Sequence, residues 1–236
     1  MTSFLKTFPV NFLKLWKKKQ IPSSVKFVNS ISNEVVLYQA DDIADCPWPQ
    51  TPEGQNAKNI LTSLVKKKTS HYIDNIKTDL RVLVLGELIL PITINEGEYD
   101  NSFVCSPYSY FISYARQSLD SFPPTWFYQS MDALLRVFGS LFRKLQFNKV
   151  VIVNNWLYAT NLYPPLNPSQ LLKITQFLQE TFPDHTIVFR SIDPCTNPTC
   201  YQELQKIGFN YVASRQIFFL NANDSSFFES RLFKSD

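Results

Sequence analysis

The sequence predicts an α/β (α+β) fold in which helices flank a mixed, twisted β-sheet. Residues 150–193 carry the pattern that supports this prediction. Val150–Val153 is an unbroken β-branched run, typical of a central strand buried on both faces, and Thr186–Phe189 is a second apolar run. A helix is expected between them, so the two strands should be parallel and joined by a right-handed crossover.

The connecting helix has clear start and stop signals. Asn167 is expected at the N-cap, Pro168 at the first helical position, and Gln170 can close a capping box. Apolar residues then recur at helical spacing on one predicted face: Leu171, Ile174, Leu178 and Phe182. Pro183 ends the helix, so the segment reads as a complete strand-helix-strand unit.

Composition and charge exclude several classes of protein. The chain has 236 residues, of which 44% are hydrophobic and 15% aromatic, which is ample for a buried core. The net charge of +3 is too small and too dispersed for a nucleic-acid binder. Four cysteines and two histidines show no metal-ligand spacing, so we expect reduced thiols and no metal. Without a long apolar run or a signal peptide, the expected location is the cytoplasm.

The chain is expected to consist of an N-terminal amphipathic segment, residues 1–24, and one α/β domain, residues 25–236. Within residues 1–20, four aromatic side chains are spaced four apart beside several lysines: Phe4, Phe8, Phe12 and Trp16. Such a pattern is typical of a helix lying weakly on an anionic membrane surface. A helix packed against its own domain, or a frayed N-terminal segment, fits it as well, and Pro9 interrupts the pattern.

Other elements follow from local patterns. Strands are expected at residues 25–28, 34–39, 102–105 and 211–220, and helices at 56–72, from Ser106 onward, at 130–147, and from Asn197 to Gly208. The helix at 130–147 is expected to turn these side chains inward: Met131, Leu134, Leu135, Phe138, Leu141, Phe142 and Leu145.

Glu87 is a candidate proton acceptor. Residues 80–94 form a long apolar stretch, and strand alternation places Glu87 on the same face as Leu83 and Leu85. Burial there would raise the pKa of the carboxyl group and suit it to general-base chemistry. The alternative is that Gly86 marks a kink that turns Glu87 outward to water.

Polar side chains follow both strands of the strand-helix-strand unit. Asn154 and Asn155 come directly after the first strand, and Arg190 and Ser191 after the second. Ligands in open α/β sheets bind beyond the carboxyl ends of such strands, so these four residues mark a candidate binding site. Alternatively, the asparagines merely satisfy loop amides and Arg190 pairs with a nearby aspartate.

Residues 197–209, NPTCYQELQKIGF, resemble the fourth helix of the GCN5-related N-acetyltransferase (GNAT) superfamily with its closing Gly-Phe. The segments NNWLYATNLYP and FPDHTIVFRS are similar to those of bacterial GNAT-like proteins with tandem lobes, of which residues 80–236 would match the N-terminal lobe. The resemblance implies that the strand at 150–155 splays from the one at 186–190, and that the gap receives the pantetheine arm of an acyl thioester.

The resemblance therefore implies an N-acyltransferase that moves an acyl group from acyl-CoA or an acyl carrier protein to an amine, with the thioester as co-substrate and no tightly bound cofactor. A peptide is one acceptor that fits. In this scheme Glu87, or a water that it orders, removes a proton, and Asn155 or backbone amides of the strand at 150–155 hold the oxyanion. Tyr201 can protonate the thiolate only if its helix is rotated. The residues expected to contact the donor are Asn154, Trp156, Asn161, Arg190 and Ser191, and Arg215 is expected to bind the substrate.

Two departures from the family pattern favour a different function. Residues 159–169, where the family has a glycine-rich pyrophosphate loop, contain no glycine and three prolines. The family's tyrosine, four residues before the helix-ending glycine, is Leu204 here, and Tyr201 lies one turn earlier. These departures favour a non-catalytic GNAT-like lobe that binds a protein or peptide partner, such as a second lobe or a second copy, whereas the polar strand ends favour the enzyme.

Overall fold

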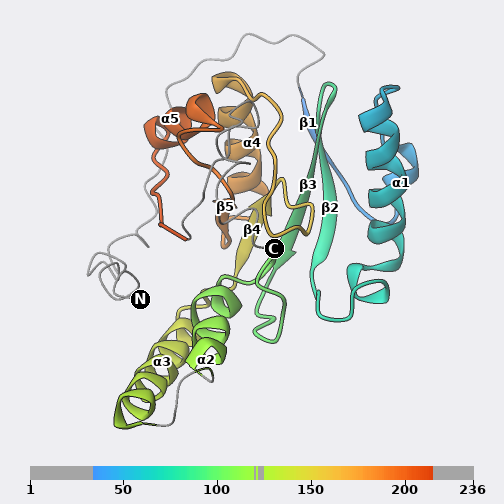
Figure 1. The fold of residues 1–236 in the computed structure, drawn as a ribbon. Helices are drawn as coiled ribbons and strands as arrows, with labels where there is room; N and C mark the ends of the chain where they lie inside the picture. The colour runs from blue at the N-terminus through green and yellow to red at the C-terminus, as the bar shows by residue number, and fades with distance from the viewer. Residues whose placement is uncertain (1–33, 120, 122–124, 215–236) are drawn as a thin grey trace, which may run out of the picture. The chain divides into compact units, whose positions relative to one another are not determined.

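Five strands form one mixed sheet in the order β1-β2-β3-β4-β5 (Figure 1). The computed structural model describes residues 34–119, 121 and 125–214. The strands are β1 Val35–Tyr38, β2 Asp79–Leu85, β3 Leu88–Asn95, β4 Val150–Val153 and β5 Thr186–Phe189. Neighbouring strands are antiparallel from β1 to β4, and β4 and β5 are parallel. The predicted mixed α/β fold is confirmed.

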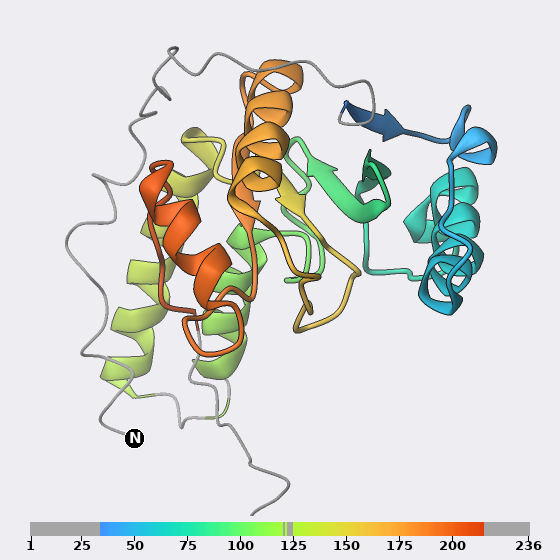
Figure 2. The same cartoon turned by 90° about the horizontal axis from the view of Figure 1, so that it is seen from above.

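The helices lie on both faces of this sheet. They are α1 Pro52–Lys67, α2 Tyr114–Leu119, α3 Trp126–Lys144, α4 Pro168–Thr181 and α5 Pro198–Lys206, with short 3-10 turns at Ile43–Asp45 and Thr69–His71 and a π-helical turn at Ser109–Ser113. Figures 1 and 2 show α1 on one face, α4 and α5 on the other, and α2 beside α3. None of the helices described is both long and apolar enough to cross a lipid bilayer.

These elements belong to one unit of the chain, Lys19–Gly208. Residues 209–214 belong to a second unit and have no regular secondary structure, so the start of the strand predicted at 211–220 is not formed. The rest of that strand, the strand predicted at 25–28 and the amphipathic segment 1–24 lie outside the described residues. The predicted domain boundaries stay a prediction.

The strand-helix-strand unit forms as predicted. Asn167 and Gln170 make the expected capping box, with Asn167 Oδ1 accepting from Gln170 N at 2.9 Å and Gln170 Oε1 accepting from Asn167 N at 3.0 Å. The side chains of Leu171 and Leu178, on the inner side of α4, are fully buried. The connection therefore returns the chain to the sheet beside β4, where β5 pairs with it.

The long apolar stretch at 80–94 is a hairpin and not one strand. β2 and β3 pair along their lengths, and Gly86 and Glu87 form the two-residue turn between them. Gly86 has φ 62°, which a type II′ turn requires at its first central position. Glu87 is exposed, so the expectation of a buried carboxylate is wrong and the outward-facing alternative is correct.

Three other elements differ from the prediction, one in type and two in where they begin. Residues 102–105 form a turn and not a strand, with Cys105 N donating to Ser102 O at 3.0 Å. Helix α1 begins four residues earlier than predicted because Thr51 Oγ1 accepts from Gly54 N at 3.1 Å. In the same way, α3 begins at Trp126 because Thr125 caps it. Ser106 caps the next helical segment as predicted.

Helix α3 has two apolar sides, and the prediction combined residues from both: Leu135 is buried and Phe142 packs against its cluster, as predicted. The side that packs against α2 buries only Leu135 and Gly139. Leu134, Phe138 and Leu145, expected to point inward, are exposed. Met131, Leu141 and Phe142 are partly buried.

The four cysteines are free thiols with different environments. Cys195 is exposed, and the other three are buried. Burial raises the pKa of Cys105 to about 12 and the pKa values of Cys46 and Cys200 to about 11. Because the thiolate is the reactive species, we expect one fast-reacting thiol per native chain near pH 8 and four after denaturation. Titration with a chromogenic disulfide reagent measures this. Cys195→Ser should remove the fast phase, and a fast phase that persists in this variant would contradict the prediction.

Candidate functional site at the end of β4

Buried polar side chains gather where β4 ends. The apolar strand is followed by Asn154 and Asn155, whose side chains are fully buried at 0% exposure. Asn154 has φ 54°, a left-handed conformation that asparagine tolerates, and this turns the chain out of the sheet. Buried amides need hydrogen-bond partners, and their identity decides what the site can do.

Asn155 is held by three separate segments of the chain. Its Nδ2 donates to Thr93 Oγ1 at 2.8 Å and to Val104 O at 2.9 Å, and its backbone N donates to Pro91 O at 2.8 Å. Its Oδ1 accepts from Leu157 N at 3.2 Å. A side-chain amide has only two N–H donors, so Asn155 has none left for an oxyanion.

Arg190 bridges the end of β5 to the same segments. Its Nη1 donates to Val104 O at 2.6 Å and lies 3.4 Å from Asn155 Oδ1. Its Nη2 donates to Ala159 O at 3.3 Å. The guanidinium group therefore joins the end of β5 to the turn at 102–105 and to the loop after β4.

The remaining predicted donor-binding residues fix this loop, residues 156–166. Asn154 Nδ2 donates to Leu162 O at 2.9 Å, and Asn154 Oδ1 accepts from Trp156 Nε1 at 2.9 Å. Asn161 Oδ1 accepts from Trp156 N at 3.2 Å, and Asn161 N donates to Ser191 Oγ at 3.1 Å. We call Asn154, Asn155, Trp156, Asn161, Arg190 and Ser191 the strand-end network, and residues 156–166 the strand-end loop.

Tyr163 adds a contact that the sequence did not suggest. Its hydroxyl donates to Val153 O at 3.1 Å, at the last residue of β4. Burial raises the pKa of the Tyr163 phenol well above its ordinary value, which keeps the hydroxyl a neutral donor. The two prolines that follow Tyr163 marked a loop in the sequence, but no local pattern indicated that the loop folds back on its own strand.

The strand-end loop has an inner and an outer side. Trp156 packs against the core beneath α1, and Leu157 packs against a cluster containing Val104 and Cys105. Tyr158 and Leu162 point outward, with 63% and 83% of their surfaces exposed. A loop that is bonded along its length therefore presents two large side chains to its surroundings.

The other predicted site residues are not part of this network. Glu87 is exposed in the β2–β3 turn, and Tyr201 is half-buried on α5. Leu204, at the position where the family has a tyrosine, is packed into the core at 1% exposure. Arg215 lies outside the described residues.

The expected gap between the two parallel strands is bridged. β4 and β5 are paired from Val150 and Thr186 to their last residues, Val153 and Phe189. Beyond these residues, the Asn161–Ser191 and Arg190–Ala159 hydrogen bonds connect the two segments. The predicted splay is therefore wrong for these strands, because side chains of the network join the segments where a pantetheine arm was expected.

Comparison with known proteins adds no assignment. No protein-family model matches this chain. No curated protein or solved structure is significantly similar to it either. The resemblance to the GNAT superfamily therefore depends on the residues quoted above and stays a hypothesis.

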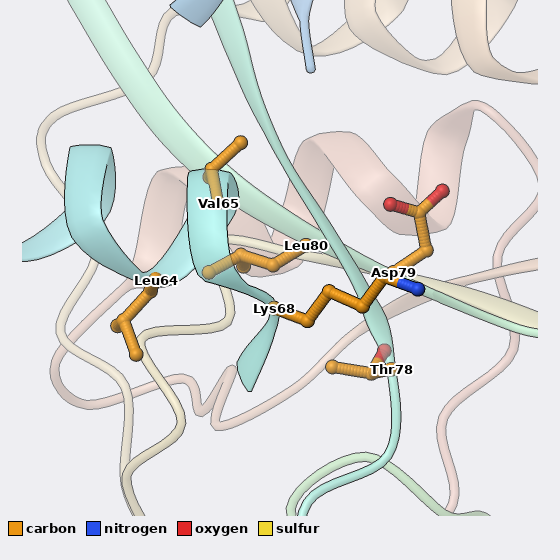
Figure 3. Close-up of a pocket in the computed structure, with 6 residues that line it drawn as sticks. All are labelled: Leu64, Val65, Lys68, Thr78, Asp79 and Leu80. Atoms are coloured by element: carbon orange, nitrogen blue, oxygen red, sulfur yellow. The ribbon is translucent and has the colours of Figure 1, made fainter. Parts of the chain in front are cut away.

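A pocket of about 280 Å³ lies between the end of α1 and the start of β2 (Figure 3). Its lining is Leu64, Val65, Lys68, Thr78, Asp79 and Leu80, and it includes no member of the strand-end network. Within the described ranges, no cluster of His, Cys, Asp or Glu is arranged to hold a metal ion.

Proposed function

We propose that this protein is a non-catalytic GNAT-like lobe that binds a protein or peptide partner through the strand-end loop. The observation that carries the proposal is the contrast between the two sides of this loop. Its base is hydrogen-bonded to buried groups of the domain, whereas Tyr158 and Leu162 are among the most exposed large side chains described.

A loop held in this way is suited to recognition. Binding a flexible loop costs conformational entropy, whereas a loop already fixed by its own hydrogen bonds avoids most of that cost. Tyrosine combines a large apolar ring with a hydroxyl group and is enriched among the residues that dominate protein interfaces. The partner chemistry that fits is an apolar cleft with a hydrogen-bond acceptor for the Tyr158 hydroxyl, and a second GNAT-like lobe is one candidate.

The test begins with a photo-crosslinking amino acid at position 158 of the full chain, followed by identification of the trapped partner by mass spectrometry. The purified partner is then titrated by calorimetry. We expect Tyr158→Ala and Leu162→Asp each to weaken binding at least tenfold, because both side chains lose their apolar contact. Ile60→Asp, which places the same charge on an exposed apolar site of α1, is the matched control and should bind like the wild type.

Acyltransferase activity is the competing proposal, and the polar residues that follow β4 and β5, Asn154, Asn155, Arg190 and Ser191, support it. Thermal unfolding in the presence of coenzyme A, acyl-CoA and an acylated carrier protein separates the two functions, because a ligand that binds only the native state raises the melting temperature. The lobe proposal expects no saturable rise with any of the three. A rise of several degrees with a thioester, together with acylation of an amine, would replace the lobe proposal with the enzyme.

A cytoplasmic location remains part of either proposal, supported by the four free thiols.

A further inference from the structure

The outer side of α3 is an exposed apolar stripe. Six large side chains form it: Trp126, Phe127, Leu134, Val137, Phe138 and Leu145. From Phe127, the positions 134, 138 and 145 follow at steps of seven, four and seven residues, which places them along one side of a helix with 3.6 residues per turn. Trp126 and Val137 lie at its edge and are 78% and 67% exposed.

This stripe is separate from the contacts that hold α3 in the fold. On its opposite side α3 packs against α2 and the preceding π-helical turn, where Tyr108, Ile112 and Leu135 form a small buried cluster. Figures 1 and 2 show the two helices side by side. At 1.5 Å per residue, the stripe from Phe127 to Leu145 is about 27 Å long. It is long, narrow and convex.

The charges around the stripe are mainly positive. Residues 107–147 contain four basic residues (Arg116, Arg136, Arg143 and Lys144) and two acidic ones (Asp120 and Asp132). Asp132 accepts from Arg116 Nε and from Arg136 Nε, each at 2.7 Å. Its negative charge is therefore already compensated by arginines of α2 and α3. Lys144, in the last turn of α3, adds positive charge beside the stripe. Arg143 faces the other side of α3, where its Nε donates to Tyr108 Oη at 3.3 Å and its guanidinium group lies over the rings of Tyr99 and Tyr108.

We propose that the stripe binds an anionic lipid surface. Amphipathic helices that lie in the membrane interface combine a long apolar side bearing aromatic residues with flanking basic residues, which is the chemistry of α3. Anionic headgroups complement the positive charge, and a bilayer accommodates a convex helix without a preformed groove. The proposal does not depend on the strand-end loop.

A second copy of the chain fits the stripe less well. Aromatic side chains carry ~150–250 Å² each, so six partly exposed residues offer on the order of 500 Å². A stable interface buries roughly 800 Å² per partner, which the stripe alone does not reach. Pairing two such helices would also bring their positive charges together.

The sequence of residues 1–20 supplies an independent reason to expect lipid binding. Its aromatic residues at four-residue spacing and its lysines have the same chemistry as the stripe. One weak determinant gives marginal, reversible membrane attachment, whereas two together give stable attachment. The two determinants can be separated by mutation, because they lie in different parts of the chain.

The experiment is flotation of the full chain with phosphatidylcholine vesicles, with and without about one third anionic lipid. We expect binding only to the anionic vesicles and a decrease at high salt, because salt screens the exposed charges. The double variant Leu134→Asp, Val137→Asp should lower the bound fraction at least tenfold. The double variant Ile60→Asp, Tyr72→Asp, which places the same two charges at exposed apolar sites outside both the stripe and the strand-end loop, is the matched control and should float like the wild type. Thermal unfolding of both variants checks that the fold is kept.

Three results would overturn the proposal. The first is a wild-type chain that does not float with anionic vesicles. The second is a double variant that floats as well as the wild type, which would assign any binding to residues 1–20 or to another surface. The third is a dimer in analytical ultracentrifugation that the double variant abolishes without an effect on vesicle binding, which would assign the stripe to a second copy.

Discussion

Replacing Asn155 by alanine is expected to lower the free energy of unfolding by about 3 kcal/mol, because the change leaves several buried groups without partners. Thr93 Oγ1 and Val104 O lose a donor, and Leu157 N loses its acceptor. No solvent reaches the position to replace the lost amide, since Asn155 has 0% exposure. For a domain of this size the loss corresponds to a decrease in melting temperature of roughly 10 °C.

The matched controls for this prediction lie in the strand-end loop. Asn161→Ala removes an acceptor for Trp156 N but no side-chain donor bond, because Asn161 Nδ2 is buried without a partner. It should therefore cost about 1 kcal/mol. Leu162→Ala removes an exposed side chain and should change stability by less than about 0.5 kcal/mol. Chemical denaturation measures all three, and an Asn155→Ala variant as stable as Leu162→Ala would show that the network does not support the fold.

The strand-helix-strand unit was predictable because its signals are local. The β-branched run of β4, the capping box of α4 and the polar residues after both strands each lie within a few positions of the feature that they define. The sequence also predicted correctly that Asn154, Asn155, Arg190 and Ser191 lie close together, because parallel neighbouring strands end at the same edge of a sheet.

What these residues bind could not be predicted in the same way. Asn155 bonds to Thr93 and Val104, which lie 62 and 51 positions away in the sequence, and Arg190 reaches Val104 across 86 positions. No periodicity reports contacts of this range. The same polar strand ends therefore suggested an open ligand site, whereas the structure closes them with the chain's own carbonyl and amide groups.

Errors at Glu87 and in α3 have a common cause in the apolar pattern. Val82–Leu85 and Leu88–Ile92 are buried or partly buried, so their side chains are apolar on both sides of the turn and the pattern continues through Gly86. In α3 the apolar residues surround more than one side of the helix, and periodicity cannot tell which side meets the core. The error in α3 is informative, because a contiguous exposed apolar side of this kind is typical of a surface that binds a partner or a membrane.

Gly54→Ala is expected to destabilise the fold by about 2 kcal/mol, although alanine is the better helix former by about 1 kcal/mol. A Cβ atom at Gly54 would lie 2.3 Å from Pro49 O and 2.9 Å from Pro49 C, distances that require the backbone of Pro49 to move. Pro49 is fixed by its neighbours, because its carbonyl accepts from Gln55 Nε2 at 3.1 Å and the preceding Trp48 is buried.

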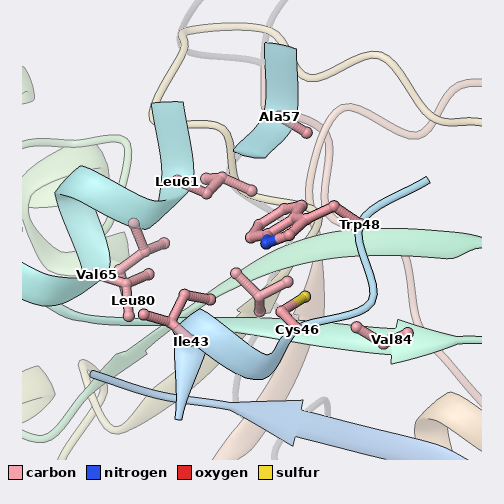
Figure 4. Packing of buried hydrophobic residues seen from close by; sticks show 9 residues of the cluster. Ile43, Cys46, Trp48, Ala57, Leu61, Val65, Leu80 and Val84 are labelled. Carbon is pink, nitrogen blue, oxygen red and sulfur yellow. The ribbon is translucent and has the colours of Figure 1, made fainter. Parts of the chain in front are cut away.

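Movement of Pro49 would disturb the core beneath α1. Figure 4 shows Trp48 among Ala57, Leu61 and Val84, in the cluster that joins α1 to the sheet. Gly97→Ala is the matched control, since its Cβ would meet nothing closer than Tyr99 Cε2 at 3.7 Å, and it should change stability by less than about 0.5 kcal/mol. Thermal and chemical denaturation of the two variants compare them directly. Equal stability would mean that the segment around Trp48 yields without loss of packing, and that α1 is held to the sheet by its own apolar side alone.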